Sequence, residues 1–291
     1  MKKFITAIAV AAVAGCSTQK EPPKPEPAKP EPPKQAETPK SKNVEVTING
    51  VTGFQDTVLQ PDGKWHIHDP ARPQPTLVAP GNFSQMAIPP SDAVVLFDGK
   101  DLSHWTDKRG NPAPWLIVDD AMVATKGDIV TTNEFGDLQL HLEFREPTPA
   151  KGEGQGRGNS GVFFMGQYEI QVLDCCQNPT YADGTTGAIY GQHPPLANAC
   201  RPPGEWQTYD IIFNVPHFGA GGELLSPAYA TVILNGVVVQ NHQAVRGATN
   251  WKSPGKYTPH GPAGPLGLQF HNNAVAFRNI WVRAVPVVDE P

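Results

Sequence analysis

Short runs in which apolar and polar residues alternate recur along this 291-residue chain, and they constrain its fold more than any other feature. The clearest run covers residues 137–145, where three leucines and a phenylalanine alternate with polar side chains. A period of two places alternate side chains on opposite faces of a strand, so one face of this strand is buried and the other is wet. No stretch shows an apolar stripe of helical period over any length. The pattern predicts an all-β protein.

Strands of this kind are separated by turn residues along most of the chain. Asn235-Gly236 tolerates positive φ at both positions and predicts a type I′ hairpin between two of them. More than ten strands without helices favour a jelly-roll β-sandwich of two antiparallel sheets. The further strands are expected at 44–48, 94–97, 115–118, 162–165, 168–173, 208–214, 230–234, 237–240, 267–271 and 275–283.

The amino terminus has the composition of an export signal. Met1-Lys2-Lys3 is positive, and residues 4–14 form an apolar run that is too short to span a membrane, which takes roughly 20 residues. The run ends in Val13-Ala14-Gly15-Cys16, which resembles the lipobox of bacterial lipoproteins. We therefore expect a signal peptide at 1–15 and lipidation of Cys16; the alternative is an ordinary secretory signal. The mature protein is expected to be exported and lipid-anchored to a membrane, periplasmic or at the cell surface.

Composition divides the rest of the chain. Residues 16–42 are rich in Pro, Glu and Lys and predict a disordered tether, because such a segment cannot bury enough apolar surface to fold. Residues 43–90 are expected to form an ordered extension packed on the sandwich, which itself covers 91–286 and leaves a tail at 287–291. A net charge of −5 argues against a nucleic-acid partner.

Three cysteines remain after Cys16. Adjacent Cys175 and Cys176 point to opposite sides of an extended chain, so at most one of them faces Cys200. Export permits a disulfide. A structural bridge and buried free thiols both remain open.

The densest set of polar candidates lies between residues 152 and 190. In the strand 168–173, Glu169 and Gln171 share one face while Ile170 and Val172 share the other. A carboxylate beside an amide suits a sugar site, because hydroxyl groups need both acceptors and donors and the carboxylate can also move protons. The alternative is an exposed polar strand face.

A second polar row and several aromatic residues extend this set. Gln269 and His271 share a face of the strand 267–271, and Arg278 joins them only if its own strand face coincides. Tyr190, Trp206 and Trp105 could stack on a pyranose ring, although a place in the core is the favoured interpretation of each. His66 and His68 are interpreted as a solvated strand face and receive no role.

An ordered series of motifs resembles the 3-keto-disaccharide hydrolase domain family over residues 92–285. The resemblance implies a concanavalin A-like lectin/glucanase sandwich, in agreement with the strand pattern. It also implies cleavage of glycosides oxidised at the sugar 3-position, by hydrolysis or by elimination and hydration. The motifs are VLFDGKDLSHW (95–105), NSGVF (159–163), YEIQVLD (168–174), TGAIY (186–190) and FRNI (277–280).

The chemistry that this resemblance implies needs a base, a group that stabilises an enolate oxygen, and a proton donor. Glu169 and Asp174 fall on opposite faces unless a bulge intervenes, which disfavours the two-carboxylate mechanism of β-glucanases. The alternative function is a non-catalytic carbohydrate-binding or cell-wall-associated module. The candidates are Glu169 or His271 as base; Arg157, Arg278 or a divalent cation at the oxyanion; Asn159, Gln171 and Gln269 on hydroxyls; Tyr190 and Trp206 as platforms; and Asp174, His193 and His271 as metal ligands.

Overall fold

The computed structural model describes residues 42–81 and 84–285, which belong to one compact unit. The expected signal peptide, Cys16 and nearly all of the tether lie outside the described residues, as does the expected tail. Within the described ranges, no helix has the length and apolar character needed to cross a membrane.

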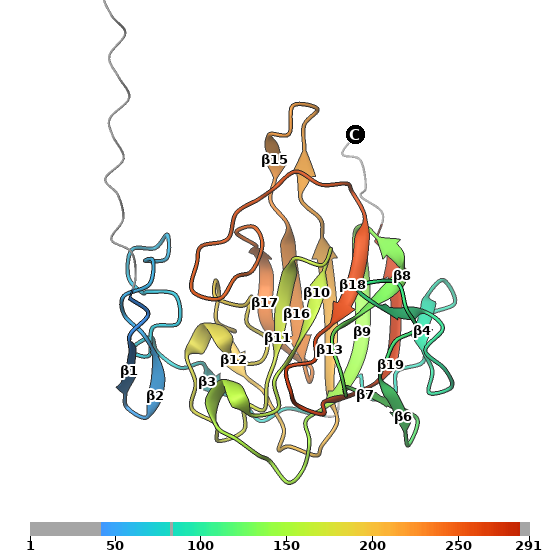
Figure 1. The fold of residues 1–291 in the computed structure, drawn as a ribbon, viewed down its shortest axis with the longest axis horizontal. Helices are drawn as coiled ribbons and strands as arrows, with labels where there is room; N and C mark the ends of the chain where they lie inside the picture. Colours follow the sequence, from blue (N-terminus) through green and yellow to red (C-terminus); the bar gives the residue numbers. More distant parts are fainter. Residues whose placement is uncertain (1–41, 82–83, 286–291) are drawn as a thin grey trace, which may run out of the picture. The chain divides into compact units, whose positions relative to one another are not determined.

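Two antiparallel sheets form the body of the described chain, and the predicted all-β, concanavalin A-like sandwich is confirmed (Figure 1). The smaller sheet has the strand order β11 (Tyr168–Val172), β10 (Ser160–Phe164), β18 (Gly264–Leu268), β8 (Ile129–Phe135) and β5 (Trp105–Asp107). The larger sheet has the order β17 (Val237–Ala244), β16 (Tyr229–Leu234), β13 (Gln207–Asn214), β9 (Leu138–Arg145), β19 (Ala276–Ala284), β7 (Ala121–Val123) and β6 (Leu116–Val118), and β4 (Val94–Phe97) also pairs with β19.

The core lies between these two sheets. Phe164 of the smaller sheet stacks on Phe213 of the larger one with ring centroids 4.4 Å apart. The buried Tyr209 hydroxyl donates a 2.6 Å hydrogen bond to the backbone oxygen of Gln171, across the same interface. Trp105 is 1% exposed and belongs to this core, as favoured by its sequence context. Each sheet therefore packs one face on the core and carries polar side chains on the other. The polar face of β9 was predicted to be wet, and this is wrong, because His141 and Glu143 are fully buried.

Two turns show how local sequence sets the strands. Asn235 and Gly236 have φ values of 50° and 83° and join β16 to β17, so the predicted hairpin is confirmed. Asn279 has a φ of 47° and lies in a β-bulge of β19, where the pairing of β19 with β9 shifts register between Arg278 and Trp281. Strict alternation over 275–283 places Phe277 and Ile280 on opposite faces of the strand. The bulge lets both be fully buried, so that expectation from the sequence is wrong.

The extension before the sandwich forms short strands that contact the body of the fold. β1 (Glu45–Ile48) and β2 (Val51–Phe54) make a hairpin, and β3 (Thr76–Leu77) pairs in parallel with β12 (Ala197–Asn198).

Outside the extension, a second hairpin pairs β14 (His217–Phe218) with β15 (Leu224–Ser226).

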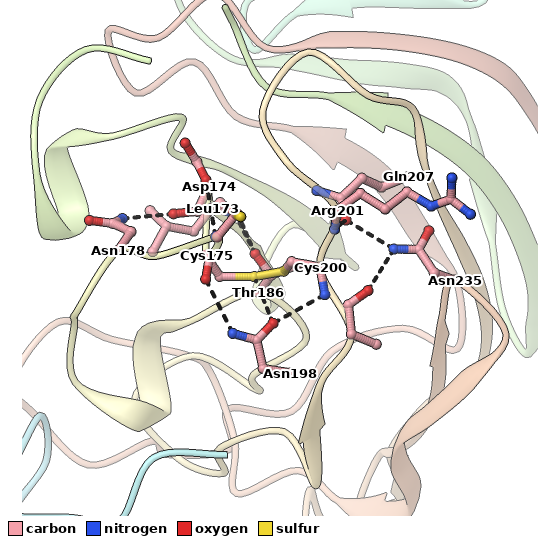
Figure 2. The surroundings of a disulfide bond; sticks show 12 residues. Leu173, Asp174, Cys175, Asn178, Thr186, Asn198, Cys200, Arg201, Gln207 and Asn235 are labelled. Carbon is pink, nitrogen blue, oxygen red and sulfur yellow. Dashed lines mark hydrogen bonds between the residues drawn. A yellow bond between two sulfur atoms is a disulfide. The ribbon is translucent and has the colours of Figure 1, made fainter. Parts of the chain in front are cut away.

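A disulfide joins Cys175 to Cys200 and closes the long connection between β11 and β13 (Figure 2). Asn198 supports it: its Oδ1 accepts the Cys200 N–H at 3.1 Å and its Nδ2 donates to the Cys175 carbonyl at 3.2 Å. Cys176 is free, so one of the two adjacent cysteines faces Cys200 and the other does not. The enclosed segment includes the 3-10 turn η2 (Ala182–Gly184) and two residues of the cavity described next, Tyr181 and Tyr190.

Candidate functional site

A cavity of about 530 Å³ lies on the outward face of the smaller sheet, at its β11 edge. Its volume falls in the range of roughly 300–1,000 Å³ that is usual for small-ligand sites. Ile170 and Val172 of β11 face the core, so the alternation places Glu169 and Gln171 in the cavity. The lining residues are Gln155, Asn159, Phe163, Glu169, Gln171, Tyr181, Tyr190, Thr249, Trp251, Gln269 and His271.

Glu169 is a buried carboxyl group at the wall of this cavity. The residue is 6% exposed, and no described residue donates a hydrogen bond to its carboxyl. Burial raises the pKa of Glu169 to about 8, and the carboxylate of Asp128 adds to the effect. A Cβ atom on Gly161 of the neighbouring strand would collide with Oε1 of Glu169, so glycine at that position makes room for the carboxyl group. The site thus holds a group that can exchange a proton near neutral pH.

Gln171 follows Glu169 by two residues and therefore lies next to it on the same face of β11. Its Nε2 donates to Oε1 of Gln155 and to the backbone oxygen of Gly184, both at 3.2 Å. Its Oε1 is buried and has no hydrogen-bond partner among the described residues. A buried acceptor without a partner is costly, so a ligand hydroxyl that donates to this oxygen would be stabilised.

Two tyrosines form another wall of the cavity. The hydroxyl oxygens of Tyr181 and Tyr190 lie 3.1 Å apart, within hydrogen-bond distance. Burial raises the pKa of both phenols above the ordinary value. They therefore stay neutral near pH 7 and can donate hydrogen bonds to a ligand in the cavity.

His68 of the extension supports these tyrosines, and the sequence interpretation of this residue was wrong. It is fully buried rather than solvated, and its φ of 62° interrupts any extended run with His66. Its ring stacks on Tyr181 with centroids 4.0 Å apart and lies 5.0 Å from the Tyr190 ring. Its Nδ1 and backbone N–H both contact the carboxylate of Asp183, at 3.1 Å. Burial opposes ionisation of Asp183, but the contacts with His68 lower its pKa overall.

The structure brings six of the sequence candidates together. Gln269 and His271 line the cavity although β18 ends at Leu268, so they lie in the segment after the strand rather than on it. Tyr181, Gln155, Thr249 and Trp251 were missed, because they reach the cavity from loops without a period that could be read in the sequence. The candidates present are Asn159, Glu169, Gln171, Tyr190, Gln269 and His271.

Arg157, Asp174 and His193 do not line the cavity. The Arg157 Nε lies 2.7 Å from Oδ2 of Asp174, whose Oδ1 accepts the Cys176 N–H at 3.1 Å. The pair thus holds the turn next to the disulfide, which leaves Asp174 poorly placed as a metal ligand. Burial lowers the pKa of His193 to about 4, with Arg246 adding to the effect. In the described part of the chain, no group of three or more His, Cys, Asp or Glu side chains could hold a metal ion.

Arg278 and Trp206 also lie away from the cavity, on the outward face of the larger sheet. The Arg278 guanidinium lies 4.1 Å from the centroid of Trp206 and 2.8 Å from Oε2 of Glu143. Burial opposes ionisation of Glu143, but the nearby His141 and hydrogen bonds from Met86 and Arg278 lower its pKa to about 2. The core separates these residues from Glu169, so the strand face of Arg278 does not coincide with the polar row and neither Arg278 nor Trp206 joins the cavity.

The family model of the 3-keto-alpha-glucoside-1,2-lyase-like domain matches residues 92–283. The chain belongs to this family. A candidate glycosyl hydrolase from Parabacteroides distasonis ATCC 8503 is 44% identical, with a TM-score of 0.67, over 80% of this chain and 99% of that one. A second candidate glycosyl hydrolase from the same organism is 21% identical, with a TM-score of 0.50 over 67% of this chain and 94% of that one, and supports the fold alone. No curated protein matches the chain significantly.

Membership of the 3-keto-alpha-glucoside-1,2-lyase-like family, with the likeness to the first of these structures, supports a carbohydrate-active enzyme. Every residue that lines the cavity lies inside the matched range. His68 lies outside it, so the extension adds a contact that the family model does not cover.

Proposed function

We propose that this lyase-like domain cleaves glycosides whose sugar is oxidised at C3, by elimination of the C1 substituent followed by hydration, or by hydrolysis. The observation that carries the proposal is the Glu169 carboxyl, which is buried at the cavity wall with its pKa raised to about 8. A carboxylate of that basicity is a stronger base than an exposed one, and it is matched to proton transfer near neutral pH.

The first step of the elimination removes a proton from carbon. A 3-keto group acidifies the C2–H, so the carboxylate form of Glu169 takes this proton and the electron pair forms an enolate. The negative charge develops on the C3 oxygen. Tyr181 and Tyr190 are neutral donors in the same cavity, and they are the groups we assign to that oxygen.

The second step expels the leaving group. The enolate electrons form the C1=C2 double bond, the C1–O bond breaks, and the leaving oxygen takes a proton. His271 is exposed at the cavity and is the residue we assign as proton donor. Water then adds across the double bond, placing a hydroxyl on C1 and a proton on C2. Gln171, Asn159 and Gln269 are assigned to the sugar hydroxyls.

The test is incubation of the purified protein with a methyl 3-keto-glucoside, with and without a chelator, followed by identification of the products. Release of methanol together with 3-keto-glucose or the unsaturated sugar is expected, and Glu169→Gln should slow it by a factor on the order of 10²–10⁴. Saturable binding without release would favour the carbohydrate-binding module instead. An activity lost on chelation would bring a divalent cation into the reaction.

We also propose that the protein is exported and acylated at Cys16. The sequence Val13-Ala14-Gly15-Cys16 after an apolar run supports this proposal. Residues 16–42 would then separate the domain from the lipid surface as a Pro-rich tether, which extends by about 3.1 Å per residue in polyproline II geometry.

A further inference from the structure

A second hollow of about 330 Å³ lies next to the cavity, and we call it the hairpin groove. It shares Gln155, Tyr181 and Trp251 with the cavity, so the two are neighbours. Its other wall is the β1–β2 hairpin, which lies outside the range matched by the family model. The residues that line it are Glu45, Gly50, Thr52, Phe54, Glu153, Gly154, Gln155, Pro179, Thr180, Tyr181 and Trp251.

We propose that the hairpin groove, which the extension forms outside the matched domain, holds the leaving-group sugar and selects a neutral one. This inference rests on the proposed function, because it assigns to the groove the part of the substrate that departs from C1 in the cavity.

Trp251 supplies the surface for such a sugar. It is 63% exposed although its ring already contacts Phe54 edge to face, with centroids 6.3 Å apart. The Lys252 ammonium lies 3.7 Å from the centroids of both rings and holds them by cation–π contact. An aromatic ring that is fixed in place and still largely exposed offers apolar area at little entropic cost to a ligand.

Gln155 connects the polar groups of the two hollows. Its Nε2 donates to the hydroxyl of Thr180 in the groove at 2.8 Å, and its Oε1 accepts from Gln171 in the cavity at 3.2 Å. A sugar in the groove would thus contact side chains that are already held in place by hydrogen bonds to residues of the cavity. Such preorganisation reduces the cost of binding.

The remaining polar lining indicates which sugar fits. Glu45 and Glu153 are exposed carboxylates, and Thr52 carries a hydroxyl group. These groups accept and donate hydrogen bonds as sugar hydroxyls require. The two carboxylates outnumber the one ammonium group, of Lys252, that lies against the rings of the groove. They therefore repel a negatively charged sugar such as a uronate, because like charges at a binding surface oppose association. A neutral sugar is therefore favoured.

The hairpin that forms the groove is tied to the supporting residues of the cavity. The Phe54 N–H donates to the backbone oxygen of His68 at 2.9 Å, and His68 itself bonds Asp183 behind the tyrosines. A Cβ on Gly53 would collide with the same His68 oxygen, so only glycine allows this close approach. The groove wall and the cavity wall thus share one rigid support.

The test compares Thr52→Trp, which fills the groove, with the wild type on two substrates. One is a 3-keto disaccharide with a neutral leaving sugar, and the other is methyl 3-keto-glucoside, which cannot reach the groove. The variant should lower kcat/KM for the disaccharide at least tenfold, mainly through KM, and change the value for the methyl glycoside less than twofold. Thr125→Trp, at an exposed threonine outside both hollows, is the matched control, and circular dichroism checks that each variant folds.

The outcomes separate the two proposals. An unchanged or equally reduced kcat/KM on both substrates overturns the subsite and leaves the proposed function intact. A wild-type preference for a uronate leaving group overturns the neutral-sugar assignment. If the wild type turns over neither substrate, the proposed function fails. Binding of the disaccharide, measured by tryptophan fluorescence, then tests the subsite by itself. Thr52→Trp should weaken that binding at least tenfold, and unchanged binding overturns the subsite.

Discussion

The Nδ1 of His68 and the Oδ1 of Asp183 lie 3.1 Å apart in the interior of the protein, with both side chains at most 1% exposed. The two residues are 115 positions apart in the chain. Their contact joins the amino-terminal extension to the loop that carries Tyr181 and Tyr190. The shape of the candidate active cavity therefore depends on residues outside the matched family domain.

Replacing Asp183 by alanine should destabilise the fold strongly. It leaves a buried histidine and the His68 backbone N–H without their partner, and breaking a buried pair from one side costs about 3–5 kcal/mol. We expect the free energy of unfolding in urea to fall by that amount. Lys100→Ala removes the exposed ion pair with Asp98 and should leave the free energy of unfolding nearly unchanged, because solvent screens that pair. Equal effects of the two substitutions would contradict the structural role of the His68–Asp183 pair.

Glu169 should control the pH dependence of turnover. As the base it acts only when deprotonated, so kcat/KM should rise with pH and level off above about 8. Glu169→Gln should lower kcat by a factor on the order of 10²–10⁴ and remove this rise. The exposed Glu205, replaced by glutamine, serves as the control. A profile of unchanged shape in the Glu169 variant would assign the base to another residue.

Glu146 should make stability depend on pH. Burial raises its pKa to about 8 in the folded state, from a reference value of 4.5. The folded protein thus holds a proton that the unfolded chain releases above pH 4.5, so the associated stability is present below pH 4.5 and is lost as the pH rises through about 8. Between these limits the loss is about 1.4 kcal/mol per pH unit.

Glu146→Gln isolates this effect, because the neutral amide does not titrate. The difference in unfolding free energy between variant and wild type should shift in favour of the variant as the pH rises from 5 to 8. Urea unfolding at several pH values measures it. A difference that stays constant over that range would show that Glu146 titrates normally in the folded protein.

The Cys175–Cys200 disulfide should stabilise both the fold and the cavity. The bridge spans 25 residues, a separation for which loop-closure entropy gives about 3 kcal/mol. The double variant Cys175→Ser/Cys200→Ser should therefore lower Tm and raise KM, because Tyr181 and Tyr190 lie in the segment that the bridge closes. Cys176→Ser, which removes the free thiol, should leave both nearly unchanged.

The proposed acylation of Cys16 predicts the cell fraction in which the protein is found. In a bacterial host, Cys16→Ser should move the protein from the membrane fraction to the soluble exported fraction, since the lipid chains are its expected anchor. Fractionation and labelling with a radioactive fatty acid measure the change. Label that persists in the variant would refute the lipobox assignment.

The sequence alone determined the strands and part of the site. A period of two is a local property of the backbone, so the alternation in β9 and β11 identified which side chains face the core without knowledge of any partner. It did not show that the polar faces of both strands are also largely buried. For the same reason it placed Glu169 and Gln171 on one face. The family motifs then indicated the sandwich and the class of chemistry.

Only the tertiary structure decided which polar faces meet. Alternation shows which residues share a face of a strand, but it does not show which sheet that strand joins or which loops cover it. Arg278 lies on the larger sheet and contacts Glu143, whereas Glu169 lies on the smaller sheet, and the core separates them. His68 becomes a supporting residue of the cavity because the chain folds back to place it beside Asp183, a contact that no local pattern encodes.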